Sequence, residues 1–251
     1  MKSLNSFFRL LPILTGVVFA PATAVADEIR VAVAGNFIGA MKALVNEFED
    51  QTEHQVTIIP GSTGKHYAQI MHGAPFDLFF AADSLRPELL ELKGLVEPNS
   101  RFTYAIGKLV LWSPSLKVID SKARIIDGDY RYLAIANPKL APYGKAAKEV
   151  LQAIGLWDEI QEKLVRGENI AQTYQFVSSG NADLGFVAYS QLLIAGKPIK
   201  RSYWEVPAAL HSPIEQQAVL LRESDAANAF LVYVKSDEAL EIVQSFGYGT
   251  R

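Results

Sequence analysis

The sequence predicts an α/β fold made of two small lobes, each an open sheet flanked by helices. Strand-like and helix-like segments alternate along the chain, which is typical of open sheets with mostly parallel strands. The alternation starts afresh near Lys108. The 251 residues, 49% hydrophobic and 20% charged, suffice for one large domain or two small ones. The two cycles of strands and helices therefore favour two lobes.

The first cycle begins with an alternating, β-branched segment at residues 29–33, which predicts a strand. Apolar residues then recur at helical spacing, and the same pair of patterns follows twice more. The predicted strands are 29–33, 55–59 and 77–82, and the predicted helices are 37–48, a helix beginning near Gly64, and 85–92. Asp83 is the predicted N-cap of the third helix.

The second cycle has the same organisation, and a tail of one strand and two helices follows it. The predicted strands are 109–112, 132–136, 184–188 and 218–221, and the predicted helices are 142–154, 170–179, 225–234 and 237–246. Pro142 lies in the first turn of its helix, where the missing N–H costs nothing.

Residues 1–26 have the three parts of a secretory signal peptide. Lys2 and Arg9 give a basic start, and residues 10–20 are an apolar run too short to span a bilayer as a mature helix. Residues 24–26 form a small-x-small cleavage site. We therefore expect a cleaved leader and an exported product that is not embedded in the membrane.

The composition excludes several kinds of function. There is no cysteine, so disulfides, thiolate metal sites, cysteine nucleophiles and a bacterial lipid anchor are excluded. Beyond residue 26 the chain has 22 basic and 27 acidic residues, a net charge of −5. Nucleic-acid binders are normally basic, so we expect no nucleic-acid partner. A protein of this charge that binds an anion must hold it by local dipoles.

A glycine turn at residues 60–66 is the most informative segment. A strand leads into it and a helix leads out, so unpaired N–H groups and the positive end of the helix dipole face the turn. Ser62 and Thr63 add hydroxyl donors, so the turn is suited to bind a small anion. A plain helix N-cap is the structural alternative.

Four turns of the chain enter a helix in this way, two in each cycle. They are residues 34–37, 61–64, 141–144 and 168–171. Ligands of open α/β sheets lie at the carboxyl ends of strands, where strand leads to helix. A cleft between the lobes would therefore be lined by helix N-termini from both sides.

Several segments together resemble the periplasmic molybdate-binding proteins of ABC importers, over essentially the whole mature chain. The matching landmarks are residues 31–37, 61–64, 69–79, 136–138, 142–144 and 184–187. The most specific of them is the Gly-Ala-Pro-x-Asp-Leu-Phe segment, which lies beside the Gly-Ser-Thr-Gly turn.

The resemblance implies a two-lobe periplasmic binding protein whose chain crosses twice between the lobes. We place the first lobe at residues 27–106 plus 214–251 and the second at 107–213. The ligand would be molybdate, and also tungstate, delivered to the permease and ATPase of an ABC transporter. The protein would be a monomer, would not be an enzyme, and would need no cofactor. The alternatives are a receptor for another tetrahedral oxyanion such as sulfate, or an exported enzyme using the same cleft.

The resemblance also implies which residues bind the anion, with no separate cation site. Asn36 matches the polar residue after the first strand, with Gly35 beside it, and Thr63 matches the hydroxyl of the second turn, with Ser62 before it. Tyr143 and Ile170 match positions that give backbone N–H groups. Some family members use a tyrosine where this chain has Ala188, with Tyr189 next to it. Whether Tyr189 contacts the ligand stays open.

Other motifs in the chain are incomplete. The turn at residues 59–66 lacks the first glycine and the final hydroxyl of a nucleotide P-loop, and no Gly-x-Ser-x-Gly elbow occurs. His66 and His72 are too far apart on a helix to share a face as metal ligands, so we expect surface histidines. Asp77 is expected to bond the backbone at a strand start, and Lys65 to be a solvated helix residue.

Overall fold

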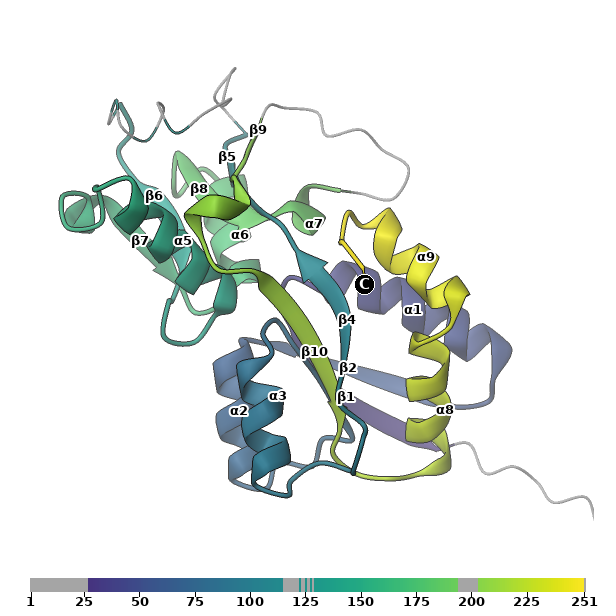
Figure 1. Ribbon diagram of the computed structural model, residues 1–251. Coiled ribbons are helices and arrows are strands. Elements are labelled where there is room, and N and C mark those ends of the chain that lie inside the picture. Colours follow the sequence, from purple (N-terminus) through teal and green to yellow (C-terminus); the bar gives the residue numbers. More distant parts are fainter. Residues whose placement is uncertain are drawn as a thin grey trace, which may run out of the picture.

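The chain folds into two five-stranded mixed sheets with flanking helices, one in each lobe (Figure 1). The computed structural model describes residues 27–114, 122, 125, 127, 129–193 and 203–250. The predicted signal peptide, residues 1–26, lies outside the described residues. The predicted fold class is thus confirmed, although "mostly parallel" was too strong, because each sheet also has antiparallel strands.

The first sheet has the strand order β2-β1-β3-β10-β4. Its strands are β1 (Glu28–Ala34), β2 (Gln55–Gly61), β3 (Leu78–Ala81), β4 (Phe102–Gly107) and β10 (Ile214–Leu220). β1 pairs in parallel with β2 and β3, whereas β10 runs antiparallel to β3 and β4. The carboxyl ends of β1, β2 and β3 therefore meet at one edge, where the turns that follow them lie together.

Helices cover both faces of this sheet because its strands alternate between two apolar cores. Ile29, Val31 and Val33 pack into the core beneath α1 (Ile38–Gln51), α8 (Asp225–Val234) and α9 (Asp237–Ser245). Ala32 packs into the opposite core, beneath α2 (Thr63–Met71) and α3 (Leu85–Leu92). Figure 1 shows these two helix layers on either side of the sheet.

The second sheet has the order β7-β6-β8-β5-β9. Its strands are β5 (Leu109–Trp112), β6 (Leu133–Ala136), β7 (Leu164–Gly167), β8 (Leu184–Ala188) and β9 (Tyr203–Glu205). Its helices are α5 (Pro142–Ala153), α6 (Ile170–Ser178) and α7 (Tyr189–Leu192), with short 3-10 turns at Gln161–Lys163 and Ala208–Leu210. β6 is parallel to β7 and β8, so the turns into α5 and α6 share an edge.

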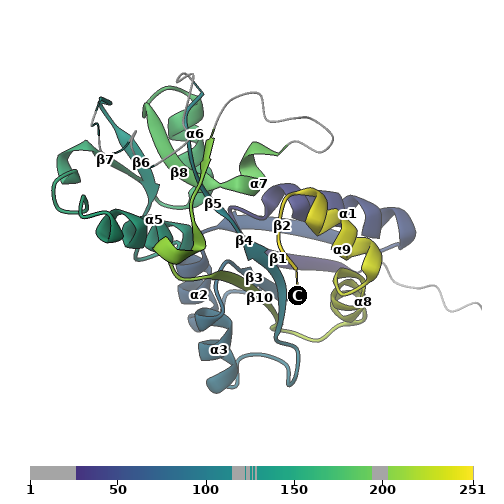
Figure 2. The same cartoon turned by 45° about the horizontal axis from the view of Figure 1, so that its top comes forward.

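Two strands carry the chain between the lobes. β4 belongs to the first sheet and β5, two residues later, to the second, while β10 brings the chain back (Figure 2). The strand membership of the two sheets is compatible with lobes that divide near residues 106 and 214. In the described part of the chain, no helix is long and apolar enough to cross a membrane.

Most predicted elements are present within about two residues of their expected ends. The strand β2 runs on through Pro60 and Gly61, and α2 begins at Thr63. Pro60 is tolerated because β2 is an edge strand, where one missing N–H breaks no ladder. The strand expected at 218–221 begins at Ile214. Sequence patterns missed β4, β7, β9 and α7, and the last three are only three or four residues long.

Candidate anion-binding site

All six residues expected to bind the anion line one small cavity between the lobes. Its walls are Ala34, Gly35, Asn36, Gly61, Ser62, Thr63, Ala82, Ala141, Pro142, Tyr143, Asn169 and Ile170. Each of the four turns that enter a helix contributes to this wall. None of these side chains carries a formal charge, so any anion there must be held by hydrogen-bond donors and helix dipoles.

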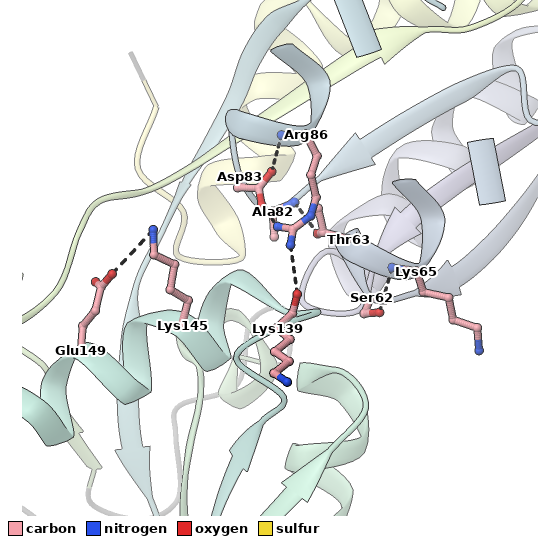
Figure 3. Close-up of polar contacts among 9 residues, drawn as sticks. All are labelled: Ser62, Thr63, Lys65, Ala82, Asp83, Arg86, Lys139, Lys145 and Glu149. Atoms are coloured by element: carbon pink, nitrogen blue, oxygen red, sulfur yellow. Dashed lines mark hydrogen bonds and ion pairs between the residues drawn. The ribbon is translucent and has the colours of Figure 1, made fainter. Parts of the chain in front are cut away.

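The turn before α2 supplies two oriented hydroxyls. Ser62 is the N-cap of α2, and its Oγ accepts the N–H of Lys65 at 3.3 Å. Thr63 Oγ1 accepts the N–H of Ala82 at 3.0 Å (Figure 3). Both side chains are buried. Because each oxygen already accepts a backbone hydrogen, its own hydrogen is left to donate into the cavity.

The turn after β1 is held against its neighbour strand and packs against the other lobe. Gly35 donates its N–H to Gly61 O at 3.0 Å. A Cβ atom on Gly35 would lie 3.2 Å from Ala171 Cβ, at the start of α6 in the second lobe. The absence of a side chain at Gly35 therefore lets the two lobes approach this closely.

The second lobe contributes the N-termini of α5 and α6. Pro142 is the first residue of α5, and Tyr143 follows it. Asn169 caps α6 by accepting the N–H of Gln172 at 2.9 Å, which places Ile170 in the first turn. Within the described residues, no acceptor bonds the N–H of Tyr143 or Ile170. Two free N–H groups thus face the cavity region, as helix geometry requires.

The Tyr143 hydroxyl lies away from these N–H groups, at the crossing strands. It accepts a hydrogen bond from Gln216 Nε2 at 3.3 Å and packs against Gly107. Burial raises its pKa well above the usual value, so the phenol stays neutral. The part of Tyr143 that is available to the cavity is therefore its backbone N–H group.

The side chain of Asn36 has partners that the sequence analysis did not foresee. Asn36 Nδ2 donates to Gln216 Oε1 at 2.7 Å and to the Tyr248 hydroxyl at 3.1 Å. Its Oδ1 is buried, and no atom of the described residues forms a hydrogen bond with it. Gln216 and Tyr248 lie 180 and 212 positions from Asn36 in the sequence, so no local motif could have indicated them.

Several contacts join the lobes around the cavity. Gly64 donates its N–H to Leu140 O at 2.8 Å, and Arg86 Nη2 donates to Lys139 O at 3.2 Å (Figure 3). Lys65 pairs with Glu168 at 3.0 Å. Because these contacts join the two lobes, the structure shows the lobes closed on each other. Lys65 is half-exposed, as expected, although it also has this partner across the cleft.

The structure overturns the expectation for His66, bears out the one for Asp77 and places Tyr189, whose role the sequence left open. His66 was expected at the surface, but it is 2% exposed, and its ring packs against Gly61 beneath the first-lobe turn. A helical position one turn after a cap can face inwards, and the sequence pattern did not reveal this. Tyr189 lies outside the cavity wall, where its hydroxyl bonds Tyr203 at 3.3 Å. Asp77 accepts the N–H of Arg30 at 2.7 Å, as expected.

Comparison with known proteins gives consistent matches. The model of the family "Bacterial extracellular solute-binding protein" matches residues 29–249. The molybdate-binding protein ModA of Azotobacter vinelandii is 45% identical, covering 95% of this chain and 96% of that protein. ModA of Rhodobacter capsulatus is 46% identical over 90% of both chains. A solved structure of the A. vinelandii periplasmic molybdate-binding protein has a TM-score of 0.85 at 42% identity, covering 89% of this chain and 99% of that one.

Proposed function

The chain belongs to the bacterial extracellular solute-binding protein family, and from this premise we propose that it captures molybdate for an ABC importer. The proposal extends to tungstate, which has the same shape and charge. The similarity to molybdate-binding relatives over nearly their whole length supports it. The protein binds its solute in the periplasm, after removal of the leader, and presents it to a permease without transforming it.

The observation that carries the proposal is a cavity wall that has no charged side chain and includes two hydroxyls and the first turns of three helices. Molybdate at neutral pH is a dianion without a proton, so it can only accept hydrogen bonds. The hydroxyls of Ser62 and Thr63 and the N–H groups of Tyr143 and Ile170 are all donors. Four charge-assisted bonds of about 1.5–3 kcal/mol each are of the order of the 8 kcal/mol that micromolar binding requires.

The same wall disfavours two other common oxyanions. Hydrogen phosphate carries a proton and needs an acceptor, whereas the two hydroxyls and two N–H groups named above are all donors. Sulfate is smaller than molybdate, so donors spaced for molybdate would be stretched around it. Each donor lost costs about 1.5–3 kcal/mol, or roughly tenfold to a hundredfold in affinity.

Isothermal titration calorimetry with molybdate, tungstate, sulfate and phosphate tests the proposal. We expect molybdate and tungstate to bind far more tightly than sulfate, and phosphate to bind weakly or not at all. Sulfate binding as tight as molybdate binding would overturn the molybdate assignment and leave an oxyanion receptor of broader specificity. Heat from none of the four anions would overturn the oxyanion assignment itself.

A further inference from the structure

The unpartnered Oδ1 of Asn36 needs a physical explanation. Asn36 is 4% exposed, and its buried Oδ1 has no hydrogen bond within the part of the chain that the structure describes. A buried acceptor left unpaired costs about 1–3 kcal/mol. A dianion in the cavity would make this worse, because it also only accepts hydrogen bonds. Asn36 lines the cavity, and in this arrangement its unpaired atom is an acceptor, whereas an anion there needs a donor.

Gln216 is hydrogen-bonded to the Asn36 amide. It is 0% exposed and lies on β10, one of the two strands that cross between the lobes. Its Oε1 accepts from Asn36 Nδ2 at 2.7 Å and from the Tyr104 hydroxyl at 3.1 Å. Its Nε2 donates to the Tyr143 hydroxyl at 3.3 Å. One buried amide thus contacts the first-lobe turn and the second-lobe helix together.

Turning both amides by half a rotation keeps these distances and changes which group donates. Gln216 Nε2 then donates to Asn36 Oδ1 and to the Tyr104 oxygen, and Gln216 Oε1 accepts the Tyr143 hydroxyl hydrogen. The Asn36 Nδ2 group takes the place that had no partner.

The surrounding hydroxyls can accommodate this exchange. Tyr104 already has a carbonyl acceptor, Ala81 O at 3.1 Å. Tyr248 lies 2.7 Å from Asn36 O and 3.1 Å from its amide, so its hydrogen can be shared between the two oxygens of Asn36. Ser190 Oγ donates to Asn36 O at 3.0 Å in either arrangement. The exchange therefore leaves Asn36 Oδ1 paired and adds one donor to the cavity.

We propose that Gln216 is a positioning residue for anion binding, because its amide turns together with that of Asn36 and directs Asn36 Nδ2 at the bound anion. This inference rests on the proposed oxyanion-binding function. It extends the binding determinants beyond the cavity wall to a residue on a crossing strand. Since Gln216 also bonds Tyr143 of the second lobe, the orienting bond forms completely only when the lobes are closed.

A purely structural role for Gln216 would lead to a different effect of its replacement on anion affinity. If Gln216 only packed the crossing strands, its replacement would weaken binding equally whether or not Asn36 had an amide. If Gln216 acts through the Asn36 amide, the two effects on affinity must be coupled. A double-mutant cycle measures this coupling.

The cycle uses Gln216→Leu, Asn36→Ala and the double variant, titrated with molybdate in the full mature chain. We expect Gln216→Leu to weaken binding about tenfold, the lower end of the loss for one charge-assisted bond, when Asn36 is present. In the Asn36→Ala protein the same change should cost less than about threefold. Gln217→Ala is the control from the next position, where the side chain bonds Arg101 and Thr103 outside the cavity. Equal losses in both backgrounds would overturn the proposal.

Gln216→Glu provides a second test that does not depend on the leucine variant folding. An ionised carboxylate accepts from Asn36, Tyr104 and Tyr143, so every partner stays bonded, but Asn36 Oδ1 is then forced towards the anion. We expect molybdate affinity at pH 8 to fall at least a hundredfold. Affinity should recover towards pH 5.5, because the introduced carboxyl group can donate once it is protonated, and burial favours that form.

The three phenols that surround position 216 do not titrate in this range. Burial raises the pKa of Tyr104, Tyr143 and Tyr248, and the neighbouring Asp83 raises that of Tyr104 further. All three phenols are therefore neutral throughout. A pH-independent loss in Gln216→Glu, or no loss, would contradict the proposal. Absence of molybdate binding by the parent would instead contradict the proposed function, so the two failures are distinguishable.

Discussion

Replacing Thr63 by alanine separates the role of this residue in binding from its role in stability. Thr63 is 1% exposed, and its Oγ1 accepts the buried N–H of Ala82 at 3.0 Å. Thr63→Ala removes one charge-assisted bond to the anion, which we expect to weaken molybdate binding by about 1.5–3 kcal/mol, or roughly tenfold to a hundredfold.

The same change leaves the N–H of Ala82 buried and unpaired. An unpaired buried donor costs about 1–3 kcal/mol of stability. For a protein of this size, each kcal/mol lowers the melting temperature by roughly 2–4 °C. The variant without ligand should therefore melt measurably earlier than the parent while remaining folded at room temperature.

Calorimetric titration and a circular-dichroism melt, both run on Thr63→Ala and Thr63→Ser, distinguish the two effects. Serine keeps the hydroxyl, so Thr63→Ser should bind nearly as tightly as the parent and keep the bond from Ala82. A Thr63→Ala protein that loses stability but keeps parental affinity would show that the hydroxyl only supports the turn. That result would refute the assignment of Thr63 as a ligand.

Three further changes test other parts of the site. Ile170→Val should bind molybdate nearly as well as the parent, whereas Ile170→Pro, which lacks the N–H but is tolerated in a first helical turn, should lose much of the affinity by calorimetry. An unchanged affinity in a folded proline variant would remove this N–H from the site. Lys65→Ala breaks a half-exposed pair with Glu168, so binding should weaken less than about fivefold and the difference should shrink at high salt. A hundredfold loss would mean that Lys65 touches the anion. Burial lowers the pKa of His66 below 6.5, so the unfolded chain binds the proton more readily and stability should fall as the pH drops below 6.5 towards the folded pKa. His66→Gln should lack this component in denaturant titrations between about pH 5 and 7.5, and an unchanged pH dependence would contradict the burial argument.

The order and type of the elements follow from local patterns. The strand at residues 29–33 and the helix at 142–154 show clear periodicity, and both are present in the structure within one residue of the predicted ends. The hydroxyls of Ser62 and Thr63 and the helix start at Ile170 could be inferred because each lies at a turn that enters a helix. Local sequence determines such turns, and strand order brings them together.

Features that depend on distant residues could not be predicted. β7 and β9 are recognisable only beside their neighbours, because four-residue and three-residue strands carry little pattern of their own. The direction of the Asn36 amide is decided by Gln216 and Tyr248, which reach it only through the tertiary fold. The burial of His66 likewise depends on how α2 packs against the end of β2.

The central claim is that neutral donors from both lobes hold one molybdate dianion. A crystal structure of the protein grown with molybdate, with anomalous diffraction measured at the molybdenum edge, tests it most directly. We predict a single strong anomalous peak in the cavity between the lobes, within hydrogen-bond distance of the Ser62 and Thr63 hydroxyls and the N–H groups of Tyr143 and Ile170. A principal peak elsewhere, or one bonded to a lysine or arginine side chain, would contradict it.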